Sequence, residues 1–120
     1  MSSWATVRVP QLVPASPNEA RREHWAQRSR RVKRERAAVR IVLAPNRPPS
    51  LPVIVTMVRC SVGTLDGDNA VGSMKAVRDE VAAWLGVDDA DPRVTWRVEQ
   101  ERVARARAGT VLHFQERGQG

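Results

Sequence analysis

The chain has 120 residues, about the length of one ordinary domain, and it is 42% hydrophobic and 28% charged. This composition is typical of a globular protein, and no apolar run is long enough to cross a bilayer. The single cysteine, Cys60, has no partner in the chain, and the first ten residues lack the features of a signal peptide. We therefore expect one soluble domain over residues 1–120, with no membrane association, in the cytoplasm.

The net charge of +7 is distributed unevenly. Residues 1–47 contain 11 Lys and Arg against 3 Asp and Glu, residues 48–100 contain 5 against 8, and residues 101–120 contain 4 against 2. Basic surfaces attract polyanions by Coulomb attraction and release of counterions. Nucleic acid is therefore the leading partner. An anionic membrane surface and a merely solvated charged face are the alternatives.

Two elements are predicted in the N-terminal part. Alternation over residues 4–9 predicts a strand that ends at Pro10. Ser16 and Glu19, with Pro17 between them, form a capping-box pattern, so a helix is expected to start there or one turn later. It should continue to about Leu43, with basic residues outside its apolar side and available to phosphates.

Four elements are predicted after the proline-rich connection 44–52. The β-branched run 53–58 predicts a buried strand, and apolar residues at helical spacing from Asn69 to Leu85 predict a second helix, with Gly86 as its cap. Alternation over 94–98 and 110–115 predicts two strands that form a hairpin, with Arg102, Arg105 and Arg107 at its far end. The expected fold is mixed α/β, of order β-α-β-α-β-β, with a small mixed sheet flanked by helices.

Asp66 and Asp68 precede the second helix and are two residues apart. In an extended backbone both side chains point to the same face. Neighbouring carboxylates repel each other unless a cation lies between them, and Mg²⁺ or Mn²⁺ also accepts phosphate oxygens. The alternative is that Asp68 caps the helix while Asp66 belongs to a turn. A second pair, Asp88 and Asp89, follows the helix and can meet the first pair only on a returning segment or through another subunit.

Lys75 lies on the second helix, about two turns after Asp68. Its ammonium group is expected to offset charge that develops on a metal-bound phosphate. The alternative is a surface ion pair with Asp79, four residues on. No glycine-rich phosphate loop is present, so no nucleotide cofactor is expected, and the two histidines are too poorly accompanied to indicate zinc.

Three tryptophans have two interpretations. Trp84 and Trp96 are expected in the core. Trp25, beside His24 in a basic segment, fits either the core or a platform on which a base stacks.

The segment from Leu65 to Val98 resembles the active-site region of the RusA family of Holliday junction resolvases, in the stretch LDGDNAVGSMKAVRDEVAAWLGVDDADPRVTWRV. The shared features are Asp-x-Asp-Asn, then Lys-Ala-x-x-Asp on a helix, then an Asp-Asp turn that leads into a strand. A weaker similarity extends to the Ser16-Pro17-Asn18 turn and to the predicted hairpin before Phe114. The resemblance implies a homodimer of mixed α/β fold, often prophage-encoded, that cleaves four-way DNA junctions with Mg²⁺ by paired symmetric nicks.

The resemblance also implies roles for individual residues. Asp66, Asp68 and Asp89 match the family's metal-binding aspartates, and Lys75 matches its catalytic lysine. Asn69 matches the asparagine after the second aspartate and is expected to contact DNA.

The chain departs from the family pattern in two places. It has three more residues between Asn69 and Lys75, so Gly72, and not a lysine, stands four residues after Asp68. If the extra residues form a loop, the lysine keeps its place; if they lengthen the helix, it rotates and moves along the axis. Gly67 replaces the apolar or acidic residue usual between the two aspartates, which loosens the backbone.

The sequence therefore leads us to expect a Mg²⁺-dependent endodeoxyribonuclease that resolves four-way DNA junctions in recombination and repair, in the cytoplasm of a bacterial host. Backbone contacts to DNA are expected from Arg28, Arg31, Lys33, Arg34, Asn69, Arg102, Arg105 and Arg107. Two alternatives remain, a non-catalytic module that binds branched or duplex nucleic acid and a nuclease for other branched DNA.

Overall fold

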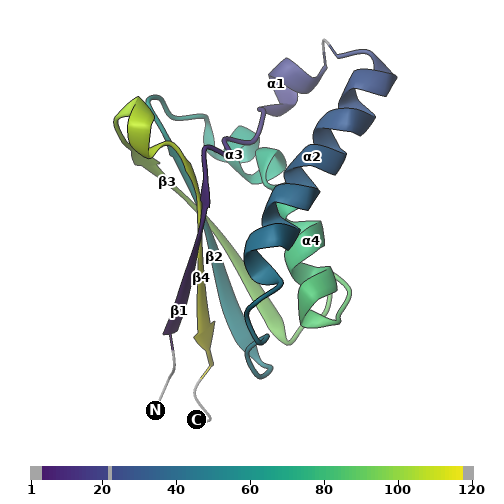
Figure 1. The fold of residues 1–120 in the computed structure, drawn as a ribbon, viewed down its shortest axis with the longest axis vertical. Coiled ribbons are helices and arrows are strands. Elements are labelled where there is room, and N and C mark those ends of the chain that lie inside the picture. The colour runs from purple at the N-terminus through teal and green to yellow at the C-terminus, as the bar shows by residue number, and fades with distance from the viewer. Residues whose placement is uncertain (1–3, 22, 118–120) are drawn as a thin grey trace.

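The computed structural model describes residues 4–21 and 23–117. The elements in chain order are β1 (Trp4–Pro10), α1 (Pro17–Ala20), α2 (Trp25–Leu43), β2 (Val53–Ser61), α3 (Gly67–Ser73), α4 (Lys75–Leu85), β3 (Val94–Arg102), the 3-10 helix η1 (Arg105–Arg107) and β4 (Gly109–Glu116). The α-helices cover one face of a four-stranded sheet (Figure 1). The mixed α/β class and the predicted order are confirmed, with each predicted helix divided into two.

The sheet has the order β1-β4-β2-β3. Strand β2 pairs in parallel with β3 and antiparallel with β4, which also pairs antiparallel with β1. The predicted hairpin of residues 94–98 and 110–115 is therefore wrong. The crossover through α3 and α4 places β3 parallel to β2, whereas β4 lies between β1 and β2, where Leu112 and Phe114 are buried centrally. Strand β2 lies inside the sheet with a neighbour on each side, and most of its residues are buried, as the sequence predicts.

The core lies between the sheet and helices α2 and α4. Its buried members include Val39 and Leu43 of α2, Val77 and Val81 of α4, and Val55, Met57, Leu112 and Phe114 of the sheet. Trp84 and Trp96 pack against this core, as expected. The two helices are also joined by Glu80, whose carboxylate is 3.0 Å from both Arg36 and Arg40. Among the described residues, no helix has the length and apolarity that a membrane span requires.

The first predicted helix is divided into α1, which ends at Ala20, and α2, which starts at Trp25. Helix α1 starts at Pro17, as predicted, whereas the side chain of Glu19 lies outside the described residues. The chain then begins α2 with a capping box, in which His24 Nδ1 accepts from Ala26 N–H at 3.2 Å and Gln27 Oε1 accepts from His24 N–H at 3.2 Å. The start predicted at Pro17 is therefore used by α1, whereas the long helix α2 starts eight residues later, which is more than the single turn considered from the sequence.

The second predicted helix is interrupted at Met74, which separates α3 from α4 and has φ −90° and ψ 6°. Gly72 and Ser73 precede it, and Ser73 Oγ donates to Ala70 O at 2.7 Å. Gly/Ser pairs and such back-bonding to the preceding turn are common causes of helix kinks. The helix ends as predicted, because Gly86 follows Leu85 with a left-handed φ of 78°.

Candidate active site

Asp66 and Asp68 lie at the start of α3. Asp66 occupies the N-cap position without a side-chain capping bond, and Asp68 lies in the first helical turn. The extended backbone predicted for this pair is therefore wrong, and so is Asp68 as the cap. Both side chains are exposed, and neither forms an ion pair or hydrogen bond with a residue that the structure describes. Within the described part of the chain, both carboxylates at this helix end are therefore available to a ligand.

The loop before Asp66 is fixed to the sheet by Gln100 of β3. Gln100 Nε2 donates to Leu65 O at 2.8 Å, and Leu65 N–H donates to Gln100 Oε1 at 2.7 Å. This pair of hydrogen bonds between a side-chain amide and the backbone holds the residue adjacent to Asp66. Gln100 was missed from the sequence because a single glutamine on a strand carries no signal of its partner.

Lys75 contacts two acidic residues. Its Nζ donates to Asp79 Oδ1 at 2.9 Å and to Asp89 Oδ2 at 3.4 Å. Asp89 reaches it because the segment after α4 returns along that helix. Hydrogen bonding to Asp79 raises the pKa of Lys75, so the ammonium form is favoured, and the hydrogen bond from Lys75 lowers the pKa of Asp89. The surface pair with Asp79 considered from the sequence is present, and Asp89 is a second acidic partner. The role of Lys75 at a metal-bound phosphate stays a prediction.

Asp89 is positioned by two further side chains that act on its backbone. Arg78 Nη2 and Trp96 Nε1 each donate to Asp89 O at 2.9 Å. The Arg78 guanidinium also lies 4.9 Å from the Trp96 ring centre, a cation–π contact, and its Nε is 3.5 Å from Asp89 Oδ2. The returning segment is therefore held against both α4 and β3.

The three candidate metal ligands come from two places, Asp66 and Asp68 at the start of α3 and Asp89 in the segment after α4. In the described ranges 4–21 and 23–117, no three His, Cys, Asp or Glu side chains form a group that could hold a metal ion. Mg²⁺ in proteins is commonly bound by one or two carboxylates, and water and substrate phosphate complete its coordination. Asp66 and Asp68 fit that requirement chemically, whereas Asp89 belongs to the Lys75 and Arg78 group.

The predicted DNA-binding residues fall into two basic regions. Lys33 and Arg34 of α2 are exposed, and Arg28 is exposed on the same helix. Arg31 is different, because its guanidinium is 2.9 Å from Glu23 and 3.0 Å from Glu35. Burial opposes protonation of Arg31, but these carboxylates raise its pKa on balance. Asn69 lies in α3, half-buried, beside Asp68.

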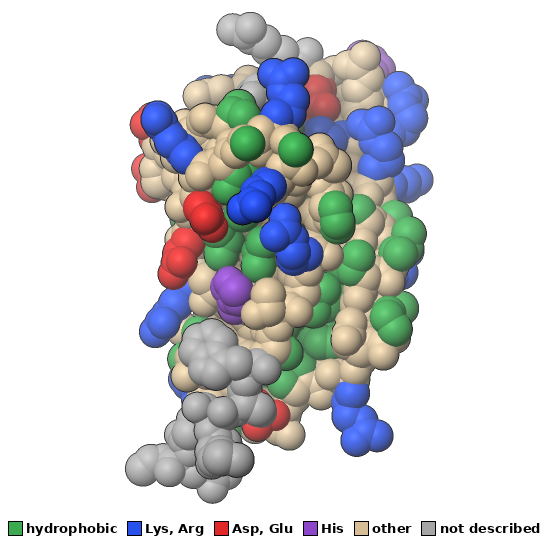
Figure 2. All heavy atoms as spheres, turned by 60° about the vertical axis from the view of Figure 1, so that its left-hand side comes forward, with side chains coloured by type: hydrophobic (Ala, Val, Ile, Leu, Met, Phe, Trp, Pro, Cys, Tyr) green, Lys and Arg blue, Asp and Glu red, His purple; other side chains and the backbone are tan. Residues whose placement is uncertain are grey.

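The second basic region is formed by Arg102 at the end of β3 and by Arg105 and Arg107 of η1, all exposed. Figure 1 shows η1 at the same end of the molecule as α1 and α3. Helix α3 contacts α1, and η1 contacts β2. On the side shown in Figure 2, basic side chains gather in the upper part of the molecule. Basic surface thus lies at the end that carries Asp66 and Asp68.

Trp25, the first residue of α2, is 74% exposed. Its ring lies 5.5 Å from that of His24, with the planes tilted by 38°. The core position considered for it is therefore wrong, since the helix turns this residue outward. A role in base stacking stays a prediction.

Comparison with protein-family models finds no match to the chain, and a search of curated proteins finds none. The likeness to the RusA family rests on the motif quoted from Leu65 to Val98 and on the weaker similarity outside it. Function is therefore inferred from that resemblance, from the contact of Lys75 with Asp89, and from Asp66 and Asp68, which have no partner among the described residues.

Proposed function

We propose that the chain is a Mg²⁺-dependent endonuclease that cleaves branched DNA, with four-way junctions as its substrate. The observation that carries the proposal is the approach of Asp89 to Lys75 at the beginning of α4. The helix just before it, α3, begins with Asp66 and Asp68. The two aspartates lie at the start of α3, and Lys75 and Asp89 meet at the start of α4. These residues follow one another in the sequence in the order of the RusA-like motif.

The roles of the side chains follow from their chemistry. Bound Mg²⁺, or Mn²⁺ in its place, supplies a Lewis acid and lowers the pKa of a bound water. Asp66 and Asp68 offer the oxygen ligands that such ions prefer. Lys75 is protonated at neutral pH, because Asp79 and Asp89 stabilise its charge and raise its pKa, and it is suited to donate a hydrogen bond to a phosphate oxygen. Asp89 orients Lys75, and Arg78 and Trp96 orient Asp89.

Binding of the junction arms is assigned to the two basic regions. Lys33 and Arg34 on α2, and Arg105 and Arg107 on η1, are exposed cations that suit contacts with phosphate oxygens. Such contacts fix the position and orientation of DNA and do not depend on its sequence. Two nicks in one junction require two active sites, so a homodimer is part of the proposal.

The second candidate is a non-catalytic module that binds branched DNA. The observation in its favour is that the described residues do not assemble three metal-binding side chains into one group. Against it, Asp66 and Asp68 place negative charge without partners among the described residues at a basic end of the molecule, where it repels DNA. A protein selected only for binding would gain affinity by losing them.

The discriminating experiment is a cleavage assay on synthetic four-way, three-way and linear DNA with Mg²⁺, Mn²⁺ or chelator. The proposal expects paired nicks in the four-way junction that require a divalent ion. Binding to all three substrates without any cleavage supports the second candidate. Cleavage of the three-way junction but not of the four-way junction would show that the protein is a nuclease for other branched DNA.

A further inference from the structure

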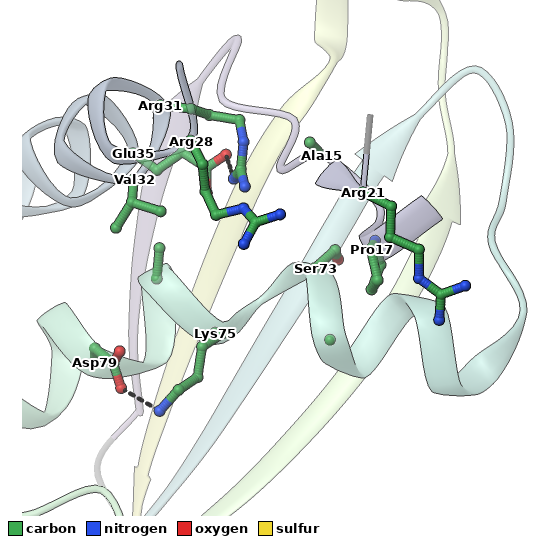
Figure 3. A pocket seen from close by; sticks show the side chains of 12 residues that line it. Ala15, Pro17, Arg21, Arg28, Arg31, Val32, Glu35, Ser73, Lys75 and Asp79 are labelled. Atoms are coloured by element: carbon green, nitrogen blue, oxygen red, sulfur yellow. Dashed lines mark hydrogen bonds and ion pairs between the residues drawn. The ribbon is translucent and has the colours of Figure 1, made fainter. Parts of the chain in front are cut away.

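A cavity of about 360 Å³ lies between the beginning of α2 and the joint of α3 and α4. In Figure 3 the Arg28 side chain extends into it from α2, Ser73 and Lys75 border it from the opposite helices, and Arg21 lies near α1. Pockets that bind small molecules span roughly 300–1,000 Å³. The cavity is therefore large enough for one small organic group, and it shares Lys75 with the candidate active site.

The charges around the cavity favour an anion. Its lining includes four basic side chains, those of Arg21, Arg28, Arg31 and Lys75. Two acidic residues, Glu35 and Asp79, leave an excess of two positive charges. Arg31 and Lys75 are paired with acidic residues, and the exposed Arg21 lies at the rim, where it can turn toward a ligand. Phosphate and carboxylate are the anions that the guanidinium group of arginine matches in geometry.

The walls of the cavity also contain apolar surface and a buried carboxylate, which a site for phosphate alone does not need. Pro17, Val32 and Ala76 provide apolar surface. Glu35 also lines the cavity; its Oε2 accepts from Arg31, but its Oε1 is buried and has no hydrogen-bond partner among the residues described. Burial raises the pKa of Glu35, with Arg31 and the backbone of Ala15 acting in the opposite direction. A buried polar atom of this kind is usually satisfied by a ligand or water.

From these features we infer that the cavity binds a single unpaired nucleotide of DNA. The phosphate lies at the rim with Arg21 and Arg28, and the base lies between the apolar walls, with an N–H group within reach of Glu35. Unpaired bases are accessible at branch points, and enzymes also extrude bases from duplexes. The choice of DNA as the ligand rests on the proposed function. Since Lys75 borders both places, the bound nucleotide adjoins the phosphate that is cut.

The inference is tested by nitrogen-15 NMR titration with the four deoxynucleoside 5′-monophosphates, the corresponding deoxynucleosides and inorganic phosphate. We expect the monophosphates to shift the amide signals of Ser73 and Ala76. Inorganic phosphate and the nucleosides should each bind at least about tenfold more weakly. Equal binding of inorganic phosphate and monophosphate would reduce the cavity to an anion site and overturn the inference, as would the absence of shifts at these residues.

Two pairs of variants locate the binding. Val32→Phe fills the cavity from its wall, and Ile41→Phe makes a comparable change on the same helix at a side chain that is 72% exposed. Arg21→Gln removes one rim charge from an exposed residue, and Arg47→Gln removes an exposed charge that does not line this cavity. The first member of each pair should weaken nucleotide binding by at least about tenfold and the second should not. Equal behaviour within both pairs would contradict the assignment.

The two proposals fail in different ways. Nucleotide binding at Ser73 and Ala76 without junction cleavage would reject the nuclease and keep the cavity. Junction cleavage that is unaffected by Val32→Phe and Arg21→Gln, with no nucleotide bound in the cavity, would keep the nuclease and reject this site.

Discussion

Lys75 Nζ lies 3.4 Å from Asp89 Oδ2, although the two residues are fourteen positions apart in the sequence. The approach depends on the return of the chain along α4, and Arg78 and Trp96 fix this return through the Asp89 backbone carbonyl. The residue just before α4, Met74, is buried in the core, so the base of Lys75 is fixed as well. A cation and a carboxylate are thereby held together on a rigid part of the molecule.

Lys75→Met should slow junction cleavage by about 10²–10³-fold and leave junction affinity nearly unchanged. The ammonium group is assigned to charge that develops in the transition state, so the rate is affected more than binding. Single-turnover cleavage and a binding titration measure the two effects. The Lys75 side chain is 67% exposed, so thermal unfolding should change little. Near-normal cleavage by the variant would leave Lys75 as a surface partner of Asp79.

The same variant should raise the titration midpoint of Asp89. The hydrogen bond from Lys75 holds the pKa of this carboxyl below its ordinary value of 3.8. A lowered carboxyl pKa contributes stability above the ordinary pKa, and that contribution is lost as the pH falls through the folded-state value. Carboxyl NMR in acid measures the shift. Asp91, whose pKa is lowered to about 2 by Arg93, is the internal control and should not move.

Gly72→Ala and Gly67→Ala should have opposite effects on stability. A Cβ at Gly72 would lie 2.7 Å from Pro17 Cγ, so Pro17 must shift, whereas a Cβ at Gly67 meets nothing within 4 Å. Replacing an interior helical glycine by alanine ordinarily stabilises by about 1 kcal/mol. We expect Gly67→Ala to stabilise by about 0.5 kcal/mol and Gly72→Ala to destabilise by about 1–2 kcal/mol in chemical unfolding. Stabilisation by both would show that Pro17 does not pack against α3.

Arg34→Ala should flatten the salt dependence of junction binding, and the log–log slope should change by about 0.9 for each phosphate that the variant no longer neutralises. Arg34 is exposed on α2 and can meet a phosphate in solution. Arg31→Ala should leave the slope nearly unchanged and destabilise the fold by about 3 kcal/mol, because Glu35 would lose its partner while its side chain is 7% exposed. The reverse pattern would show that Arg31, and not Arg34, faces DNA.

Local sequence patterns predicted the helices and strands of this chain better than they predicted which strands pair with each other. The β-branched run of β2, the helical spacing of α4 and the stop at Gly86 are properties of neighbouring residues, and all three predictions were confirmed. The hairpin of β3 and β4 was wrong because alternation identifies a strand and the face it buries, not the strand beside it. The pairing of β4 with β1 joins residues that are distant in the sequence, such as Thr6 and His113.

The same difference between local patterns and distant contacts explains why only part of the candidate site was predicted. Asp66, Asp68 and Lys75 were identified as candidate site residues from a local motif. The helical backbone at Asp68 was not predicted, because a glycine at position 67 favours no single conformation. The roles of Gln100 and Trp96 depend on contacts across the fold and had no signal in the sequence. The structure also gives a reason for the missing lysine at Gly72, since Pro17 packs where its side chain would begin.

The measurement that tests the central claim most directly compares junction cleavage and junction binding for Asp68→Asn with Mg²⁺ present. This change removes a metal-binding charge and hardly alters the shape of an exposed side chain that has no partner among the residues described. We predict that cleavage is abolished and that junction affinity is retained or increased, because one repelling charge is removed. Cleavage at the wild-type rate, or loss of binding in step with loss of cleavage, would contradict the assignment of Asp68 to a metal-dependent active site.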